Sequence, residues 1–547
     1  MNENVIYEII KSIDISIEAT GEIYNYILEY NYREASNLLS ELFTLISSIN
    51  SYYLPKEDIT ENKICESILY SIRKINIYLK TRSNNLLNKI EFELLPLIEE
   101  LKLEVYKYKV INYGNEEEKI KFFEEDIKEL CYNKYVEESE KSGQYKYDLS
   151  IMVVGYNKLE YTQKCITSII EEVPDYINYE LILINHGSSD GTEEYFQKVS
   201  PTKQIDILKN GGGMMALTRI IEGKYFMSIS NDIIIGENAI ENMYKCISSS
   251  EDIGVIVPST CNISNNQRVK EALYSNMDDF EAFVKENNKY DPYRHEERVR
   301  LCNPVTVGKT SLFYSKQGIH PDRFILANDV MSFPDDKMSL MLRRKGYKLI
   351  LQNDAYCHHF GSVTIKEEMD NKGEGYSDKF YLRGRKAFFN EFGIDPWGKG
   401  SYFIKEVINS IEYKDTNKNI LSIDCGLGSM PLKIREEIYE KYHKRLKMDA
   451  ILTEKNYYED IKYLYDNIIE LDNIIKINFD NIGDQYDYIV CQAELNEENK
   501  EYLLNNLYKL MDNGCQLCIY DKNNYINEEF FVNCNISNIG KWKIIIK

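Results

Sequence analysis

Apolar residues recur at helical spacing through the first part of the chain. Ile64, Ile68 and Ile72 lie four positions apart, so they share one face of a helix that has about 3.6 residues per turn. The region contains little Gly or Pro and no group of residues that carries chemistry. This pattern predicts a helical domain over residues 1–144.

The pattern changes near residue 145 to short, nearly continuous apolar runs. They cover residues 149–154, 180–184 and 225–229, and a helix-like segment separates the first two. Such runs are typical of buried parallel strands in an α/β sheet. Polar residues follow the third run, and ligands of open α/β sheets bind at the carboxyl ends of the strands. We therefore predict an α/β catalytic domain over 145–400.

A second α/β pattern begins after about residue 400. Apolar runs open at Asn419, Ala450 and Tyr486. They predict a separate Rossmann-like unit over 401–547. The chain of 547 residues is thus expected to be an α/β multidomain protein with three domains, since a domain has about 100–200 residues.

Charge and hydropathy narrow the possible partners. Acidic residues outnumber basic ones by 88 to 66, which gives a formal net charge of -22. Such a field repels nucleic-acid phosphates and anionic lipid headgroups, so we expect no nucleic-acid partner. No signal-like segment opens the sequence and no apolar stretch is long enough to span a bilayer. The expectation is a cytoplasmic protein without membrane insertion.

The twelve cysteines favour free thiols. Only Cys515 and Cys518 form a C-x-x-C pair, and a zinc site needs a second ligand pair that is not visible in the sequence. A large acidic chain of this kind normally keeps its cysteines reduced and buried.

Two segments at predicted strand ends carry a family resemblance. They are Ile-Met-Val-Val-Gly-Tyr-Asn at 151–157 and Leu-Ile-Asn-His-Gly-Ser-Ser-Asp-Gly-Thr at 183–192. The region resembles the family 2 glycosyltransferases of GT-A fold. This implies that four residues bind the nucleotide: Val154, Tyr156, Asn157 and Asn185. The family usually has an acidic residue at the last of these positions, and Asn185 keeps a hydrogen-bonding oxygen without the charge.

Two further segments fit the same resemblance with an alternative. Three consecutive glycines allow the backbone to approach a ligand closely, so Asn210, Gly211 and Gly212 are interpreted as donor contacts; the alternative is a mobile turn. Asp190 and Thr192 could belong to the family motif, or could simply turn the chain and cap the next helix.

A metal site is implied at Ser-Asn-Asp, 230–232, where the family has its Asp-x-Asp type motif. Asn231 and Asp232 would meet the donor, but only Asp232 is acidic, and a strand-end turn is the alternative. His359 is the expected second ligand, because His-Phe-Gly-Ser-Val-Thr from 359 is similar to a late family motif; His358 is the other choice of register. An imidazole ligand favours Mn²⁺ over Mg²⁺.

The catalytic base is implied in Pro334-Asp335-Asp336, which resembles the acidic pair that precedes a helix and a Gly-Tyr turn in this family. Counting back from Gly346 assigns the base to Asp335, with Asp336 in reserve. The alternative is that both acids only stabilise the first turn of a helix. A single base and a single displacement would invert the anomeric centre, with the base removing the acceptor proton.

The C-terminal unit has a resemblance of its own. Asp-Cys-Gly-Leu-Gly at 424–428, with Glu454 farther on, resembles the cofactor-binding start of the S-adenosylmethionine-dependent methyltransferases. Met430 stands where a third glycine is common, and no catalytic motif for methyl transfer is recognisable. We expect this fold without that activity. Trp397 either lines an acceptor groove or fastens the domain boundary.

The domain combination looks like that of bacterial glycosyltransferases that modify flagellin. The resemblance implies transfer of GlcNAc from UDP-GlcNAc to a Ser or Thr hydroxyl of flagellin. Three alternatives stay open: a cell-surface polysaccharide acceptor, a methyltransferase with a degenerate sugar-binding module, and a scaffold without activity. The sequence makes no prediction of oligomeric state.

Overall fold

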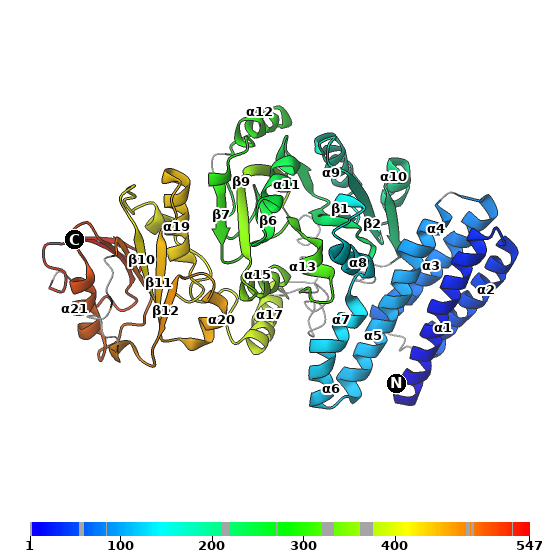
Figure 1. Ribbon diagram of the computed structural model, residues 1–547, viewed down its shortest axis with the longest axis horizontal. Coiled ribbons are helices and arrows are strands. Elements are labelled where there is room, and N and C mark those ends of the chain that lie inside the picture. The colour runs from blue at the N-terminus through cyan, green and yellow to red at the C-terminus, as the bar shows by residue number, and fades with distance from the viewer. Residues whose placement is uncertain are drawn as a thin grey trace. The chain divides into compact units, whose positions relative to one another are not determined.

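The computed structural model describes residues 3–53, 60–83, 85–208, 219–269, 272–319, 333–361, 376–476, 482, 486–527 and 529–547 (Figure 1). The chain divides into two compact units. Unit 1 comprises Met1–Ile247, Pro304–Leu326 and Cys357–Lys372; unit 2 comprises Ser248–Asn303, Ala327–Tyr356 and Gly373–Lys547. Asn210, Gly211 and Gly212, interpreted above as donor contacts, lie outside the described residues.

The first part of unit 1 is helical, which confirms that prediction (Figure 1). Its α-helices are α1 (Glu3–Leu28), α2 (Tyr32–Ser48), α3 (Thr60–Thr81), α4 (Leu86–Lys89), α5 (Leu95–Tyr113), α6 (Glu116–Lys121), α7 (Ile127–Cys131) and α8 (Lys134–Ser142). Wider π-helical turns interrupt them at η1 (Ile49–Tyr53), η2 (Ile90–Leu94) and η3 (Phe122–Asp126). The apolar positions that predicted these helices are buried: Ile64, Ile68 and Ile72 belong to their shared core.

The sheet of unit 1 contains the three predicted apolar runs. Its strands are β1 (Tyr147–Gly155), β2 (Tyr179–His186), β3 (Lys203–Ile207), β4 (Gly223–Ser230) and β8 (Val305–Lys309), in the order β3-β2-β1-β4-β8. The first four are parallel and β8 is antiparallel to β4. The unit also contains helices α9 (Leu159–Glu172), α10 (Thr192–Val199), α13 (Thr310–Tyr314) and all but the last two residues of α11 (Ala239–Ser249). The prediction of an α/β centre is confirmed.

A buried charge cluster ties the helical region to this sheet. The Lys89 ammonium contacts the carboxylate of Glu93 and lies 2.8 Å from Asp206 Oδ2 on β3. The backbone N–H of Asp206 donates to Glu93 at 2.9 Å. All three side chains are buried. Each charge has an opposite partner, which is the condition under which such groups are tolerated away from water.

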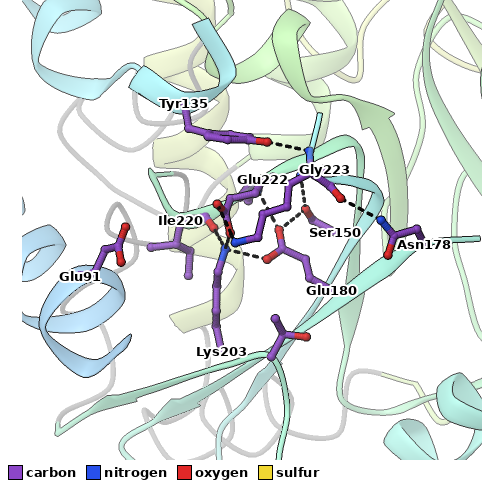
Figure 2. A network of polar contacts seen from close by, with 12 residues as sticks. Glu91, Tyr135, Ser150, Asn178, Glu180, Lys203, Ile220, Glu222 and Gly223 are labelled. Atoms are coloured by element: carbon purple, nitrogen blue, oxygen red, sulfur yellow. Dashed lines mark hydrogen bonds and ion pairs between the residues drawn. The ribbon is translucent and has the colours of Figure 1, made fainter. Parts of the chain in front are cut away.

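A second buried cluster lies where β2, β3 and β4 begin (Figure 2). The ammonium of Lys203 lies 2.6 Å from Glu180 and 2.7 Å from Glu222, and donates to the carbonyl of Ile220 at 2.5 Å. Glu180 also accepts a hydrogen bond from Ser150 Oγ at 2.5 Å. The cluster fixes the start of three strands, two of which, β2 and β4, carry candidate functional residues at their opposite ends.

Unit 2 begins with the strands and helices that come before and after the acidic pair along the chain. They are β6 (Ile253–Thr260), α12 (Met277–Asn287), η5 (Pro292–Arg294), β7 (His295–Arg298), α15 (Pro334–Arg344), β9 (Lys348–His359) and α17 (Tyr376–Phe392). Strand β7 pairs antiparallel with β9, with His295 opposite Gln352. The last three residues of β9 belong to unit 1, where they pair with β5 (Ile233–Ile235).

A seven-stranded sheet forms the remainder of unit 2. Its strands are β10 (Asn419–Ile423), β11 (Lys447–Leu452), β12 (Asn467–Glu470), β13 (Tyr488–Cys491), β14 (Gln516–Tyr520), β15 (Asn535–Ile539) and β16 (Trp542–Ile546). The order is β12-β11-β10-β13-β14-β16-β15; the first five are parallel, and β16 is antiparallel to both neighbours.

Helices precede and connect these strands. They are α18 (Lys405–Ile408), α19 (Ser429–Tyr442), η6 (Lys455–Tyr457), α20 (Tyr458–Ile461), η7 (Ile474–Lys476) and α21 (Lys500–Leu510). The apolar runs predicted from Asn419, Ala450 and Tyr486 overlap β10, β11 and β13. The interpretation of this part as a Rossmann-like, methyltransferase-like unit and the domain boundaries at 144 and 400 stay predictions.

None of the twelve cysteines forms a disulfide, and nine of them are buried. Within the described residues, we find no helix with the length and apolar character needed to cross a membrane.

Candidate functional site

The carboxyl ends of β1 and β2 bring Asn157 and Asn185 to one edge of the sheet, because Gly155 lies opposite Asn185 in the parallel ladder. Asn185 is buried, and its Oδ1 accepts a hydrogen bond from the backbone N–H of Ser188 at 2.9 Å. The Ser188 hydroxyl in turn accepts from the backbone N–H of Asn157 at 2.8 Å. The Asn185 oxygen is thus already used in the turn after β2, which it shapes.

Asn231 joins the same edge from β4, which pairs with the other side of β1. Its amide nitrogen donates to Thr162 Oγ1 at 2.9 Å and to the carbonyl of Asn157 at 3.3 Å. Val154 and Tyr156 lie at the end of β1 and are half-buried. All the described residues that were interpreted as nucleotide contacts therefore gather where β1, β2 and β4 end.

Asp190 makes the contacts of a turn and a helix cap, one of the two alternatives for it. Its Oδ2 accepts from the backbone N–H of Leu159, the first residue of α9, at 2.8 Å. Its Oδ1 accepts from Thr192 Oγ1 at 2.6 Å, where α10 begins. An acceptor at a helix start satisfies an N–H that lacks a partner within the helix.

Asp232 and His359 lie together, with Asp232 Oδ2 3.4 Å from His359 Nε2. The antiparallel pairing of β5 with β9 sets this geometry, because Ile233 lies opposite His359. The carbonyl of Asp232 also accepts from the backbone N–H of Phe360 at 3.1 Å. His358 points to the other face of the strand, where its ring meets Phe360 edge-on. Of the two histidines, His359 is thus the one beside Asp232.

The Asp232 and His359 side chains fit a divalent cation. Two ligands at about 2.1 Å from one octahedral ion lie about 3 Å apart, close to the observed separation. Among the residues that the structure describes, no group of three or more His, Cys, Asp or Glu side chains could hold a metal ion. The pair would therefore leave most coordination positions for phosphate oxygens and water, as is usual at nucleotide sites.

The acidic pair opens α15, in unit 2. Pro334 occupies the first helical position, and Asp335 and Asp336 follow in the first turn, where Pro and acidic residues stabilise a helix start. Asp335 is half-buried and accepts from the backbone N–H of Asn303 at 3.2 Å. Burial, and then the neighbouring charge of Asp336, raise the pKa of Asp335 to about 6.

Asp336 is held much more firmly than Asp335. Its Oδ1 accepts from Arg300 Nε at 2.7 Å, and the Trp397 indole is a further polar neighbour. Burial raises the pKa of Asp336, while the Arg300 guanidinium acts in the opposite direction. A carboxylate with these two partners is suited to fix geometry, whereas Asp335 has a pKa close to that expected of a general base near neutral pH.

Three partners of the acidic pair were not singled out from the sequence as such: Arg300, Asn303 and the indole of Trp397. They lie 32 to 61 positions from the aspartates, in segments without a recognisable motif. Trp397 was noted only as an acceptor-groove or boundary residue. The signal in the sequence that could have pointed to Trp397 is that the chain has two tryptophans in all.

Comparison with known proteins finds a family similarity in the central region. Residues 150–307 match the family described as Glycosyl transferase family 2. The minor teichoic acid biosynthesis protein GgaB of Bacillus subtilis is 32% identical over 113 residues, which are 19% of this chain and 12% of that protein. The uncharacterized glycosyltransferase RT0329 of Rickettsia typhi is 28% identical over 197 residues, or 35% of this chain and 58% of that protein.

These matches cover less than two thirds of either relative. Among solved structures, S. aureus TarS 1-349 in complex with UDP-GlcNAc matches with 14% identity and a TM-score of 0.31, covering 44% of this chain and 67% of that one. A TM-score at this level supports no conclusion about ligand or mechanism.

Proposed function

We propose that this protein transfers a sugar from a nucleotide-sugar donor to a hydroxyl acceptor with inversion of the anomeric centre. The premise is the match of residues 150–307 to the family 2 glycosyltransferases. The observation that carries the proposal is the state of Asp335. It is a half-buried carboxylate at a helix start, with a pKa of about 6 and a fixed neighbour. A family 2 domain needs one such base for a single displacement.

In the proposed reaction, Asp335 takes the proton of the acceptor hydroxyl. The acceptor oxygen forms a bond to the anomeric carbon as the bond between that carbon and the donor diphosphate breaks, so one bond forms and one is lost. Asp336 pairs with Arg300 and keeps the helix start in place. A positioned base of this kind contributes a rate factor of about 10²–10⁴.

Asp232 and His359 are the proposed holders of a divalent cation, Mn²⁺ in preference to Mg²⁺ because an imidazole is present. A bound cation would offset the negative charge that develops on the leaving diphosphate. Asn157, Asn185, Ser188 and Asn231 form the hydrogen-bonded strand ends against which we place the nucleotide, with Val154 and Tyr156 beside them. Asn210, Gly211 and Gly212 stay proposed donor contacts.

For the substrates, we propose UDP-GlcNAc as donor and a Ser or Thr hydroxyl of flagellin as first acceptor, both from family resemblance. A cell-surface polymer is the second acceptor proposal, and the match to a protein of teichoic acid biosynthesis favours it. An acceptor panel that contains flagellin and a polyol-phosphate polymer separates the two, since only one should incorporate radiolabelled sugar.

The pKa of Asp335 sets an expected pH profile. A base must be deprotonated to accept a proton, so kcat/KM should rise about tenfold per pH unit below pH 6 and level off above it. The charged groups beside Asp335 are Asp336 and Arg300, which form an ion pair with each other. The check is the rate of nucleoside diphosphate release between pH 4.5 and pH 8 in wild type and Asp335→Asn. A profile that is flat across pH 6 in wild type would remove Asp335 from the role.

Replacing His359 with Ala should weaken metal activation. Loss of groups that merely orient a ligand lowers metal affinity about 10–100-fold, so loss of the ligand itself should raise the Mn²⁺ concentration for half-maximal activity by at least about tenfold. His358→Ala is the matched control, because His358 is the next residue on the same strand and faces the other way. Equal metal dependence in the two variants would exclude His359 as a ligand.

A further inference from the structure

The glycine-rich loop after β10 is occupied by another part of the same chain. The carbonyl of Lys399 accepts from the backbone N–H of Leu427 at 3.1 Å, and the carbonyl of Gly400 accepts from the backbone N–H of Ser429 at 3.0 Å. Ser429 is the first residue of α19. Backbone N–H groups at such a loop and helix start are the ones that would otherwise bind an anionic or polar ligand.

Two glycines make this approach possible. A Cβ on Gly426 would lie 2.1 Å from the carbonyl oxygen of Lys399, and a Cβ on Gly400 would lie 1.9 Å from the carbonyl oxygen of Cys425. Both glycines have positive φ, 55° and 72°, which favours glycine on its own. The two backbones are therefore in direct contact, and a cofactor could reach the loop only by displacing the segment 398–401.

The acidic residue after β11 is also engaged. Glu454, which the methyltransferase resemblance places near a cofactor, forms an ion pair with the Lys399 ammonium. A cavity of about 470 Å³ lies beside the segment, lined by Trp397, Gly398, Lys399 and Gly400, and by Glu454 and residues after β13 and β14. Among the described residues that line this cavity, none belongs to 424–429. The segment therefore separates the cavity from the loop, and the loop does not fit S-adenosylmethionine.

The loop also contacts the helix of the acidic pair. The buried guanidinium of Arg343, in the last turn of α15, donates to the carbonyl of Leu427 at 3.1 Å and to that of Asp460 at 2.5 Å. At the other end of α15, the Trp397 ring lies 4.7 Å from that of Phe333, and its indole is a polar neighbour of Asp336. Trp397 directly precedes the segment 398–401.

We propose that the Gly426–Ser429 loop is a cradle for the chain's own segment 398–401 instead of a cofactor site, and that it thereby positions Trp397 and α15 so that the acidic pair is held in place. Trp397 is then a positioning residue, which acts through Asp336. The cradle for segment 398–401 rests on the C-terminal contacts alone. The positioning of the acidic pair rests also on the proposed transferase function.

The first test is equilibrium dialysis of the full chain against radiolabelled S-adenosylmethionine. We expect no saturable binding up to about 1 mM, the weak end of specific affinity. Saturable binding at micromolar concentration would overturn the cradle.

The second test compares Gly400→Ala with Gly393→Ala. The two glycines have similar φ, 72° and 75°, but nothing lies within 4 Å of a Cβ on Gly393, so only Gly400→Ala disturbs the cradle beyond backbone strain. In a Trp542→Phe background, where Trp397 is the one tryptophan left, we expect a red-shifted Trp397 emission for Gly400→Ala and an unchanged emission for Gly393→Ala. Equal spectra would overturn the cradle, whether or not the protein has transferase activity.

The positioning role has its own measurement. Trp397→Phe keeps an aromatic ring beside Phe333, leaves the loop intact and removes the indole N–H near Asp336. We expect kcat to fall by about tenfold or more while the Kd of the donor is unchanged, because small displacements of reacting groups cost rate and not ground-state binding. An unchanged kcat would refute the positioning role; absence of turnover in wild type would refute the proposed function and leave the dialysis and fluorescence results to decide on the cradle.

Discussion

Asp335→Asn should lower kcat for sugar transfer by about 10²–10⁴-fold, the contribution of a positioned general base. Asparagine has nearly the shape of aspartate and keeps an oxygen that can accept from the Asn303 backbone N–H, but its amide cannot take the acceptor proton. Donor binding should be unchanged. The measurement is nucleoside diphosphate release at saturating donor, together with donor Kd from calorimetry.

Stability separates this effect from unfolding. The pKa of Asp335 is raised from 3.8 to about 6 in the folded chain, so the folded state binds its proton more tightly. Stability therefore falls as pH rises between these two values, and the full cost of ionising Asp335 is present above pH 6. Asp335→Asn removes that penalty and should be at least as stable as wild type at pH 7.5. Asp278→Asn is the matched control, an exposed aspartate at the second position of α12. If both variants keep full activity, the base lies elsewhere.

Lys203→Met should lower the free energy of unfolding by about 3–5 kcal/mol, the usual effect of removing one partner from a buried ion cluster. Glu180 is fully buried and Glu222 nearly so, and both contact the Lys203 ammonium. Methionine fills a similar volume but leaves two carboxylates without this cation. The measurement is the urea midpoint of the transition that melts the sheet of unit 1.

Lys146→Met is the control for this prediction, because Lys146 contacts the same Glu222 from the surface, at 3.0 Å with 51% of its side chain exposed. An exposed ion pair contributes about 0–1 kcal/mol to stability, so the urea midpoint of Lys146→Met should be close to that of wild type. Similar shifts of the urea midpoint in Lys203→Met and Lys146→Met would mean that burial does not determine how much the cluster stabilises the fold.

The strands of the central sheet could be predicted because they are buried on both faces. Residues 149–154 and 180–184 are nearly continuous apolar runs for that reason. The same runs placed Asn157 and Asn185 at one edge, where the structure has them. The choice of His359 over His358 rested on a motif and on strand alternation, and the pairing of β5 with β9 puts His359 beside Asp232. Their chemical roles stay predictions.

Other features depend on contacts that local sequence does not encode. A glycine pattern indicates that something approaches the backbone closely, but not what does so. Gly426 and Gly428 were therefore interpreted as a cofactor-binding start, whereas the structure has Lys399 and Gly400 against that loop. Asp336 likewise has Arg300 as its partner, a residue far from it in the sequence. Each alone is an ordinary basic or glycine residue in the sequence.

The most direct test of the central claim is turnover of nucleotide sugars by the purified full chain. Wild type and Asp335→Asn would be incubated with UDP- and GDP-sugars, with and without Mn²⁺, in the presence of flagellin or a polyol-phosphate polymer, and nucleoside diphosphate release and donor binding would be recorded. We predict metal-dependent release from at least one donor by wild type, and its loss in Asp335→Asn with binding retained. Absence of both binding and release with every donor would contradict the proposal that this chain is a glycosyltransferase.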